Sequence, residues 1–171
     1  ERALACAPRC ITGLARLPID RAFSIRGFGT VVTGTLASGT LSPGDEVEIL
    51  PAGLRGRVRG VQVHNGAVEC AVAGQRTAVN LQGLSPEQVP RGQTLLTPGG
   101  LRASAMLDVE IQLLSDAPGP LMDQQRVRVH SGTSELLGRV RLLSGLEIQP
   151  GGSGFAQLRL ESPAVAAPGD R

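Results

Sequence analysis

The sequence predicts an all-β protein built from two units in tandem. Three observations favour this fold class: short β-branched runs recur along the chain, Gly/Pro/Asn/Asp clusters separate them, and no convincing amphipathic helix is present. Glycine (23) and proline (12) are frequent, which also favours short strands over long helices. The 171 residues suffice for one sizeable domain or two small ones, so the number of domains must come from the pattern.

Residues 1–16 are expected to be a linker from something upstream. Cys6 and Cys10 lie in it without a second Cys or His pair at zinc spacing, so no metal site is predicted. With Cys70 they are interpreted as reduced thiols. The first residues lack the apolar centre of a signal peptide, and no apolar run has the length of a membrane span. A cytoplasmic protein without a membrane partner is expected.

The first unit, residues 17–98, opens with two strands, Ala22–Ile25 and Thr30–Leu36, joined at a bend that contains Gly27 and Gly29. A strand and not a helix follows this bend, which argues against a phosphate loop. Further short runs at the spacing of a closed barrel or a sandwich are Glu46–Leu50, Arg55–His64, Ala67–Ala73, Ala78–Leu81 and Thr94–Leu96.

Local signals refine this first unit. Asn65-Gly66 between two apolar runs predicts a hairpin, with His64 as a turn residue. The apolar phase slips between Val58 and Val61, which predicts a β-bulge at Gly60. Ser85-Pro86-Glu87-Gln88 predicts at most one short turn of helix.

The second unit, residues 99–171, follows the break at Thr97-Pro98-Gly99-Gly100. Val109 and Ile111 alternate with Asp108 and Glu110, and similar alternation recurs later, which predicts a half-buried antiparallel sheet. Near the end, Pro168-Gly169-Asp170 repeats the Pro43-Gly44-Asp45 turn that opens a strand in the first unit. No strand follows the second copy, so the second unit is expected to lack its last strand or strands.

All 17 basic residues are arginine, and the net charge is +2. Without lysine the chain cannot be a P-loop nucleotide hydrolase or a pyridoxal enzyme. His64 and His130 lie far apart in sequence, and neither is near a cysteine or a strained serine turn, so no catalytic site is predicted. Arginine instead suits bidentate contacts with phosphates and carboxylates.

One candidate binding surface is a basic row in the second unit. Its members alternate along two neighbouring runs, which would place them on one face at a spacing suited to a phosphate backbone. A solvated outer face explains the same alternation. With three Phe and no Tyr or Trp, the chain has no aromatic platform for stacking bases. The row comprises Arg126, Arg128, His130, Arg139 and Arg141.

A family resemblance begins at Ile19-Asp20-Arg21-Ala22-Phe23-Ser24-Ile25-Arg26-Gly27-Phe28-Gly29-Thr30-Val31-Val32-Thr33-Gly34-Thr35. This motif resembles the start of the second domain of translational GTPases, and companion motifs follow in order. Among these GTPases the chain is most similar to bacterial selenocysteine-specific elongation factors, because Asp20-Arg21 occurs together with Arg76. The companion motifs are Gly44-Asp45, 57–64, 73–76 and Pro90-Arg91-Gly92-Gln93.

The resemblance implies a fold and a context. The two units would be antiparallel β-barrels of the domain II and domain III type, following a GTPase domain that holds GTP and Mg. The fragment itself would be no enzyme and hold no cofactor. The implied partners are selenocysteinyl-tRNA, the ribosome, the factor's own GTPase domain and, through absent winged-helix domains, a messenger-RNA hairpin. The implied function is delivery of selenocysteinyl-tRNA to the ribosome for UGA recoding.

The resemblance also implies site residues. Asp20, Arg21 and Arg76 would line the cleft for the selenocysteinyl group, where the arginines stabilise a selenolate and Asp20 accepts from the α-amino group. Glu69, five residues before Gly74, matches a glutamate that packs on the terminal adenosine of tRNA in Tu-type factors. Because neighbours on a regular strand face opposite ways, Asp20 and Arg21 can share a pocket only where the strand has not begun or is distorted.

Three other readings stay open. In the first, Asp20 and Arg76 form an ion pair with a purely structural role. In the second, the barrels belong to another translational GTPase, Tu-type or initiation-factor-like. In the third, the chain is a β-barrel scaffold that binds only protein.

Overall fold

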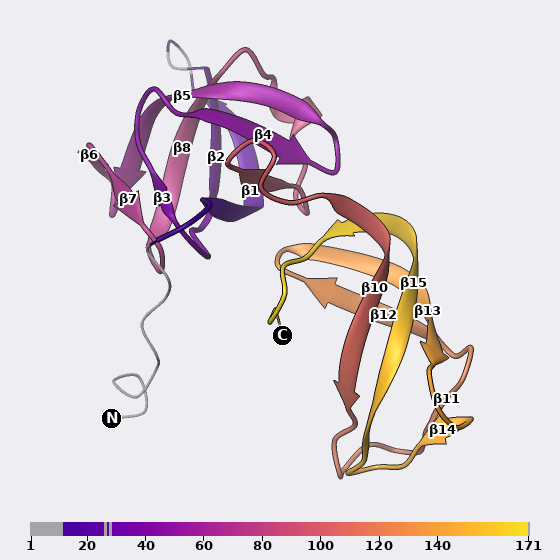
Figure 1. The fold of residues 1–171 in the computed structure, drawn as a ribbon. Helices are drawn as coiled ribbons and strands as arrows, with labels where there is room; N and C mark the ends of the chain where they lie inside the picture. The colour runs from indigo at the N-terminus through magenta and orange to yellow at the C-terminus, as the bar shows by residue number, and fades with distance from the viewer. Residues whose placement is uncertain (1–11, 26, 28, 171) are drawn as a thin grey trace, which may run out of the picture. The chain divides into compact units, whose positions relative to one another are not determined.

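The computed structural model describes residues 12–170 except Arg26 and Phe28. The expectations for linker residues 1–11, including Cys6 and Cys10, and for Arg26 and Phe28 in the glycine bend therefore lie outside the described residues. The chain divides into two compact units, Glu1–Arg102 and Ala103–Arg171, each considered by itself below (Figure 1). The division falls just after the Gly/Pro break at residues 97–100.

The first unit is a closed antiparallel β-barrel. Hydrogen-bonded neighbours follow in the order β4-β9-β1-β2-β8-β5, and β5 pairs again with β4, which closes six strands into a ring. The spacing of the strands in the sequence was compatible with either a closed barrel or a sandwich. The β4–β5 ladder shows that this unit is a barrel. The strands are β1 Arg16–Ile25, β2 Gly29–Thr35, β3 Thr40–Leu41, β4 Glu46–Leu50, β5 Leu54–Val63, β6 Gly66–Val68, β7 Ala71–Val72, β8 Arg76–Gln82 and β9 Thr94–Leu96.

The barrel interior is filled by branched aliphatic side chains. Leu17 and Ile19 on β1 and Val32 on β2 are fully buried, because alternate residues of each strand point inward. Each such side chain contributes about 1.5–3 kcal/mol through burial. The largest fully buried side chains among the described residues all lie in this unit: Leu17, Ile19, Leu36, Leu41, Ile49, Leu81, Leu95, Leu96, Val32, Val47, Val58 and Val79.

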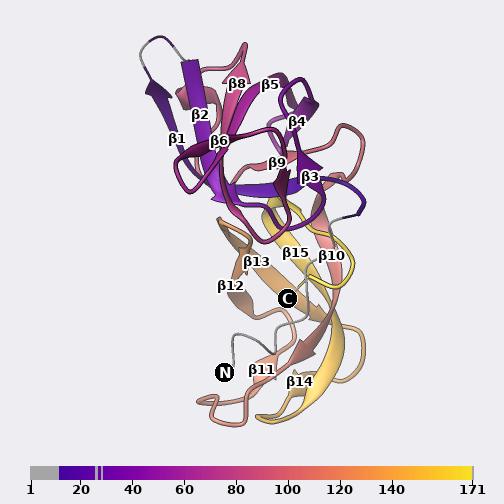
Figure 2. The ribbon, with the colours of Figure 1, turned by 90° about the vertical axis from the view of Figure 1, so that its left-hand side faces the viewer.

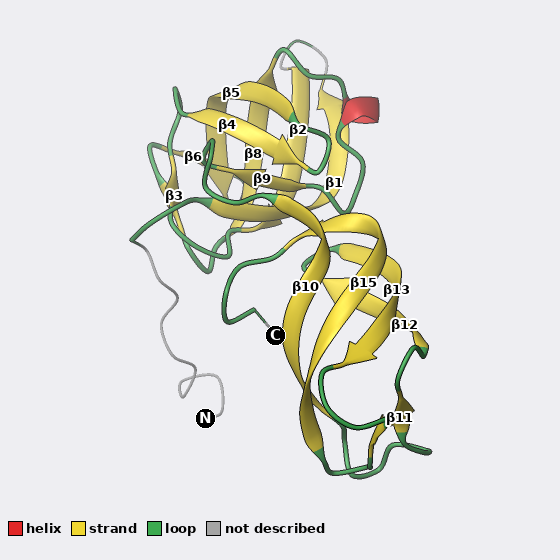
Figure 3. Ribbon diagram, turned by 45° about the vertical axis from the view of Figure 1, so that its right-hand side comes forward, coloured by secondary structure: helices red, strands yellow, loops and turns green. Residues whose placement is uncertain are grey.

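Three local predictions are confirmed, one with a shift. The β5–β8 register slips between Val58 and Gly60, which is the expected bulge. A single short helical turn, η2 (Pro86–Gln88), is the one helical segment that Figure 3 colours among the described residues. The β5–β6 hairpin also forms, but its two turn residues are His64 and Asn65, with φ of 52° and 63°. Gly66 belongs to β6 and pairs with Val63.

Two predicted strand boundaries were wrong. β1 begins at Arg16, six residues before the predicted Ala22, because its first residues pair with β9 as its later residues pair with β2. The predicted strand Ala67–Ala73 is interrupted at Glu69 and Cys70. Its two pieces pair with different partners, β6 with β5 and β7 with β3, so one continuous strand cannot serve both.

The second unit is an antiparallel sheet in the order β10-β15-β13-β12, with a small β11–β14 ribbon. Val140, Leu142, Ile148 and Ala156 are buried in its core, and the predicted alternation is confirmed. In the part of the chain that the structure describes, β10 and β12 remain the edges of this sheet. The strands are β10 Ala103–Gln112, β11 Leu121–Met122, β12 Arg126–Ser131, β13 Ser134–Leu142, β14 Glu147–Ile148 and β15 Ser153–Val165.

The all-β fold class is therefore confirmed. No helix within the described ranges combines the length and the apolar character that a membrane crossing requires. Cys70 is an exposed free thiol in the bend between β6 and β7.

Candidate functional site

A β-bulge in β1 creates the geometry of the candidate site. In the β1–β2 ladder Ile19 pairs with Gly34 and Arg21 pairs with Thr33, so Asp20 is an extra residue without a partner in the ladder. A bulge interrupts the strict alternation of side chains. The strand has thus begun before Asp20 but is distorted there, which meets the condition for Asp20 and Arg21 to share a site.

Arg76 reaches Asp20 from across the sheet. β1, β2 and β8 lie side by side (Figure 2), and Arg76 opens β8 opposite Thr35 of β2. Its guanidinium forks onto the carboxylate: Nη1 donates to Asp20 Oδ2, and Nη2 donates to Oδ1 at 3.1 Å. The Thr33 hydroxyl donates to the same Oδ1 at 2.7 Å. Three adjacent strands therefore converge on one carboxylate.

The electrostatics keep this carboxylate ionised. Partial burial of Asp20 alone would raise its pKa, but the hydrogen bonds from Arg76 and Thr33 and the charges of Arg76 and Arg21 together lower the pKa below its ordinary value. The hydrogen bond and charge of Asp20 in turn raise the pKa of Arg76. The contribution of Arg21 indicates that its charge acts on Asp20.

The group is asymmetric in exposure and in charge. The Asp20 side chain is 23 % exposed, whereas that of Arg76 is 60 % exposed. Arg21 is exposed, and its side chain makes no hydrogen bond or ion pair among the residues that the structure describes. Two guanidiniums against one carboxylate leave one positive charge uncompensated. The arrangement suits an anion that also carries a hydrogen-bond donor or a cation.

Of the predicted residues Asp20, Arg21 and Arg76, the structure joins Asp20 and Arg76 by direct hydrogen bonds, whereas Arg21, adjacent at the bulge, acts on Asp20 through its charge. Thr33, whose hydroxyl donates to Asp20 Oδ1, was not predicted as a site residue. The sequence places Thr33 on the predicted second strand. Only the register between the first two strands shows that its hydroxyl lies beside Asp20. Glu69 is exposed in the bend between β6 and β7, and no described hydrogen bond or ion pair joins it to this group.

The basic row of the second unit is largely neutralised by neighbouring carboxylates. Its residues lie at exposed positions of β12 and β13, and Arg126 faces Arg139 across the ladder. Arg139 donates from Nη1 to the Gln124 carbonyl at 2.9 Å. The ion pairs are Arg126–Glu161 at 2.8 Å, Arg128–Glu135 at 3.2 Å and Arg141–Asp123, and His130 is exposed near the end of β12.

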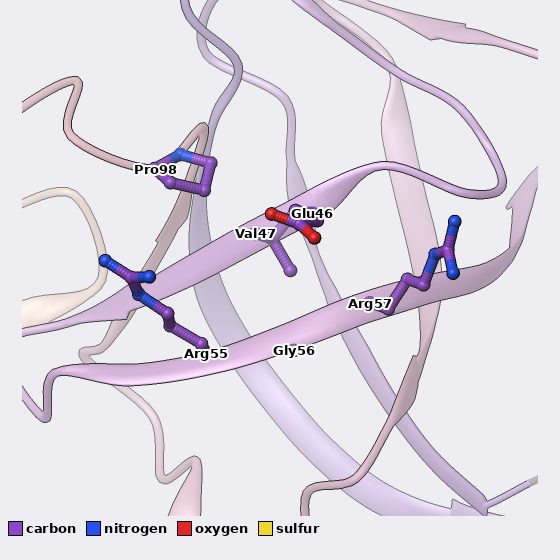
Figure 4. Close-up of a pocket in the computed structure, with 6 residues that line it drawn as sticks. All are labelled: Glu46, Val47, Arg55, Gly56, Arg57 and Pro98. Atoms are coloured by element: carbon purple, nitrogen blue, oxygen red, sulfur yellow. The ribbon is translucent and has the colours of Figure 1, made fainter.

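Two further features complete the survey of sites. Among the described residues, no group of three or more His, Cys, Asp or Glu is arranged to hold a metal ion. A surface hollow of about 300 Å³ in the first unit contains none of the predicted site residues. It is lined by Glu46, Val47, Arg55, Gly56, Arg57 and Pro98 (Figure 4).

Comparison with known proteins assigns both units. Residues 29–96 match the family model of elongation factor Tu domain 2. Residues 108–171 match the model of the β-barrel domain of selenocysteine-specific elongation factor. The chain is 45 % identical, over 96 % of its length, to the selenocysteine-specific elongation factor of Desulfomicrobium baculatum. Over nearly its whole length the chain is therefore similar to selenocysteine-specific elongation factors.

Further relatives agree with this assignment. The selenocysteine-specific elongation factor of Haemophilus influenzae is 36 % identical over 91 % of the chain. A crystal structure of bacterial selenocysteine-specific elongation factor EF-Sec superposes with a TM-score of 0.78, at 31 % identity over 91 % of the chain. The chain spans about a quarter of the length of these factors: 26 % and 25 % of the two relatives and 24 % of the crystallised chain. It is a translation factor module.

Proposed function

We propose that the chain is the aminoacyl-tRNA-binding module of a selenocysteine-specific elongation factor, and that Asp20, Arg21 and Arg76 hold the selenocysteinyl group. The observation that carries this proposal is the fork of the Arg76 guanidinium on the Asp20 carboxylate at the β1 bulge, with the charge of the adjacent Arg21 acting on the same carboxylate and one positive charge left at the surface. The whole factor would deliver selenocysteinyl-tRNA to the ribosome for UGA recoding.

Charge provides the discrimination. A selenol is more acidic than a thiol, whose pKa is about 8.5, so the selenocysteinyl side chain enters as an anion whereas the hydroxyl of serine stays neutral. The two side chains are similar in size, and a size difference this small gives little selectivity. A site with an uncompensated guanidinium favours the selenolate and leaves that cation unpaired with serine.

Because Asp20 pairs with Arg76 and not with Arg21, the two arginines would have different roles in binding. Arg21 has no described partner and is available to the selenolate at once, whereas Asp20 already occupies the fork of Arg76. A ligand that brings both an α-amino group to Asp20 and a selenolate to Arg76 exchanges one ion pair for two. Seryl-tRNA supplies only the first of these contacts, so Arg76 would lose its partner without gaining another.

Other contacts of the module are proposed with it. Glu69 would pack on the terminal adenosine of the tRNA, and the second-unit row of Arg126, Arg128, His130, Arg139 and Arg141 would contact its backbone. Because carboxylates already pair with three of these arginines, the row would contribute less per charge than unpaired arginines. The longer factor would supply the GTPase domain with GTP and Mg, and the domains that bind a messenger-RNA hairpin.

The test compares selenocysteinyl-tRNA and seryl-tRNA binding to the full-length factor by filter binding at several salt concentrations. The wild type should prefer selenocysteinyl-tRNA. Arg21→Gln and Arg76→Gln should each reduce this preference at least about tenfold, since each removes a charge-assisted contact made only with the anion. Arg102→Gln, which removes an exposed charge elsewhere in the first unit, is the control and should leave the preference intact.

One result would favour the structural reading of the ion pair. If Arg76→Gln lowers the melting temperature while the preference for selenocysteinyl-tRNA is unchanged, the Asp20–Arg76 pair serves the fold and the proposal is wrong. Salt-independent binding of both tRNAs would also contradict it, because phosphate contacts weaken as salt rises.

A further inference from the structure

Three arginines, Arg55, Arg57 and Arg59, lie exposed along β5, away from the site described above. The first two line the surface hollow of about 300 Å³. Figure 4 shows their side chains on either side of the Glu46 carboxylate. The hollow is partly open to solvent, so an extended ligand can lie along it.

These guanidiniums keep most of their donors unused. Arg57 Nε donates to the Gly44 carbonyl at 3.1 Å, which orients the side chain and leaves its terminal nitrogens available. The side chains of Arg55 and Arg59 make no hydrogen bond or ion pair within the described part of the chain. In the second unit, by contrast, Arg126, Arg128 and Arg141 are each paired with a carboxylate.

The carboxylates nearest in register do not neutralise this row. Glu46 faces Arg57 and Glu48 faces Arg55 across the β4–β5 ladder. No ion pair joins either couple among the described residues, and Glu48 instead accepts a hydrogen bond from the Gly99 backbone N–H at 3.2 Å. The row therefore carries three guanidiniums with unsatisfied donors on one strand.

We propose that Arg55, Arg57 and Arg59 form a site for the sugar–phosphate backbone of an RNA strand. Arg55 and Arg57 are two residues apart on a strand, hence about 7 Å apart. This is about twice the 3.4 Å axial spacing of phosphates along one strand of a duplex, so the two side chains reach separate phosphates. The planar guanidinium fork matches phosphate oxygens.

The surroundings favour RNA over a protein partner. Stable protein interfaces bury an apolar centre, but the exposed large apolar residues that the structure describes in the first unit, Leu14, Phe23 and Ile25, do not line this hollow. No aromatic side chain lines it either, so bases are not stacked and recognition is independent of sequence. Because the chain is a module of a translation elongation factor, RNA is the polyanion it meets.

The test measures binding of a fluorescein-labelled twelve-nucleotide oligouridylate to the protein by anisotropy over a series of salt concentrations. Arg55→Gln combined with Arg57→Gln should weaken binding roughly tenfold. The slope of log affinity against log salt should fall by about 1.4, since each phosphate contact with a single strand contributes about 0.7. The probe carries no aminoacyl group, so the result does not depend on the Asp20 site.

Two comparisons make the outcome decisive. Arg91→Gln combined with Arg102→Gln removes the same net charge elsewhere in the first unit and should leave the slope nearly unchanged. Glu46→Gln removes the carboxylate between the two arginines and should strengthen binding severalfold, whereas Glu110→Gln in the second unit should not. Melting temperatures establish that each variant is folded. Equal slopes for the two double variants, or no gain from Glu46→Gln, would overturn the proposal.

Discussion

At the scale of residues, the site is organised by one carboxylate. Asp20 receives Arg76 on both oxygens and Thr33 on one of them, and Arg21 adds its charge from the adjacent position. The motif placed Asp20 and Arg21 side by side in sequence, but Arg76 lies 56 residues farther along the chain. The expectation that these three residues share one site rested on the family resemblance, because sequence spacing alone does not predict which strands become neighbours.

The pKa shift of Asp20 predicts a pH dependence of stability. Because its folded-state pKa is lowered, Asp20 stabilises the fold fully above its unfolded pKa of about 3.9 and loses this contribution as the pH falls through the folded value. The difference in urea-unfolding free energy between wild type and Asp20→Asn should be constant near neutral pH and shrink below about pH 4. A difference that grows toward low pH would contradict the ionised pair.

At the scale of elements, the decisive feature is the close approach of β1 and β2 beside the bulge. A Cβ on Gly34 would lie 2.2 Å from the Pro18 carbonyl oxygen and 2.8 Å from Leu17 Cδ2, so only glycine fits at this point. Gly34 pairs with Ile19, the last residue in register before the bulge. Gly34 therefore allows β1 and β2 to pair closely just before the bulge at Asp20.

Gly34→Ala should consequently disturb both the barrel and the site. Forcing a methyl group against β1 should cost about 1–3 kcal/mol in the free energy of unfolding, measured by urea denaturation. It should also reduce discrimination between the two aminoacyl-tRNAs by displacing Asp20 relative to Arg76. Gly60→Ala is the matched control, because nothing lies within 4 Å of its added Cβ. Equal losses for both variants would show that the close approach is unimportant.

At the scale of the whole molecule, two separate cores support the two units. The first is a closed ring of strands around Leu17, Ile19 and their neighbours, and the second is a smaller cluster around Val140 and Ala156. Both are built almost entirely from aliphatic side chains. Each unit therefore depends on its own core residues.

This organisation predicts local effects of core substitutions. Ile19→Ala should destabilise the barrel by about 2–5 kcal/mol, and Val140→Ala should destabilise the second unit by a smaller amount, since a smaller side chain is truncated. Hydrogen exchange followed by mass spectrometry should show the main loss of amide protection within residues 12–102 for the first variant and within 103–170 for the second. Equal loss across both ranges for either variant would contradict separate cores.

The sequence by itself determined the all-β class, the bulge at Gly60 and the presence of the β5–β6 hairpin, whose turn forms one residue before the predicted Asn65-Gly66, because these follow from local periodicity and turn chemistry. Tertiary structure determined the features that depend on contacts between distant parts of the chain. The β4–β5 ladder closed the barrel, two different partners interrupted the strand predicted at residues 67–73, and carboxylates from other strands of the sheet paired with the second-unit arginines. It also placed the Thr33 hydroxyl and the Arg76 guanidinium on Asp20, because only the register of three strands determines which side chains meet across a sheet.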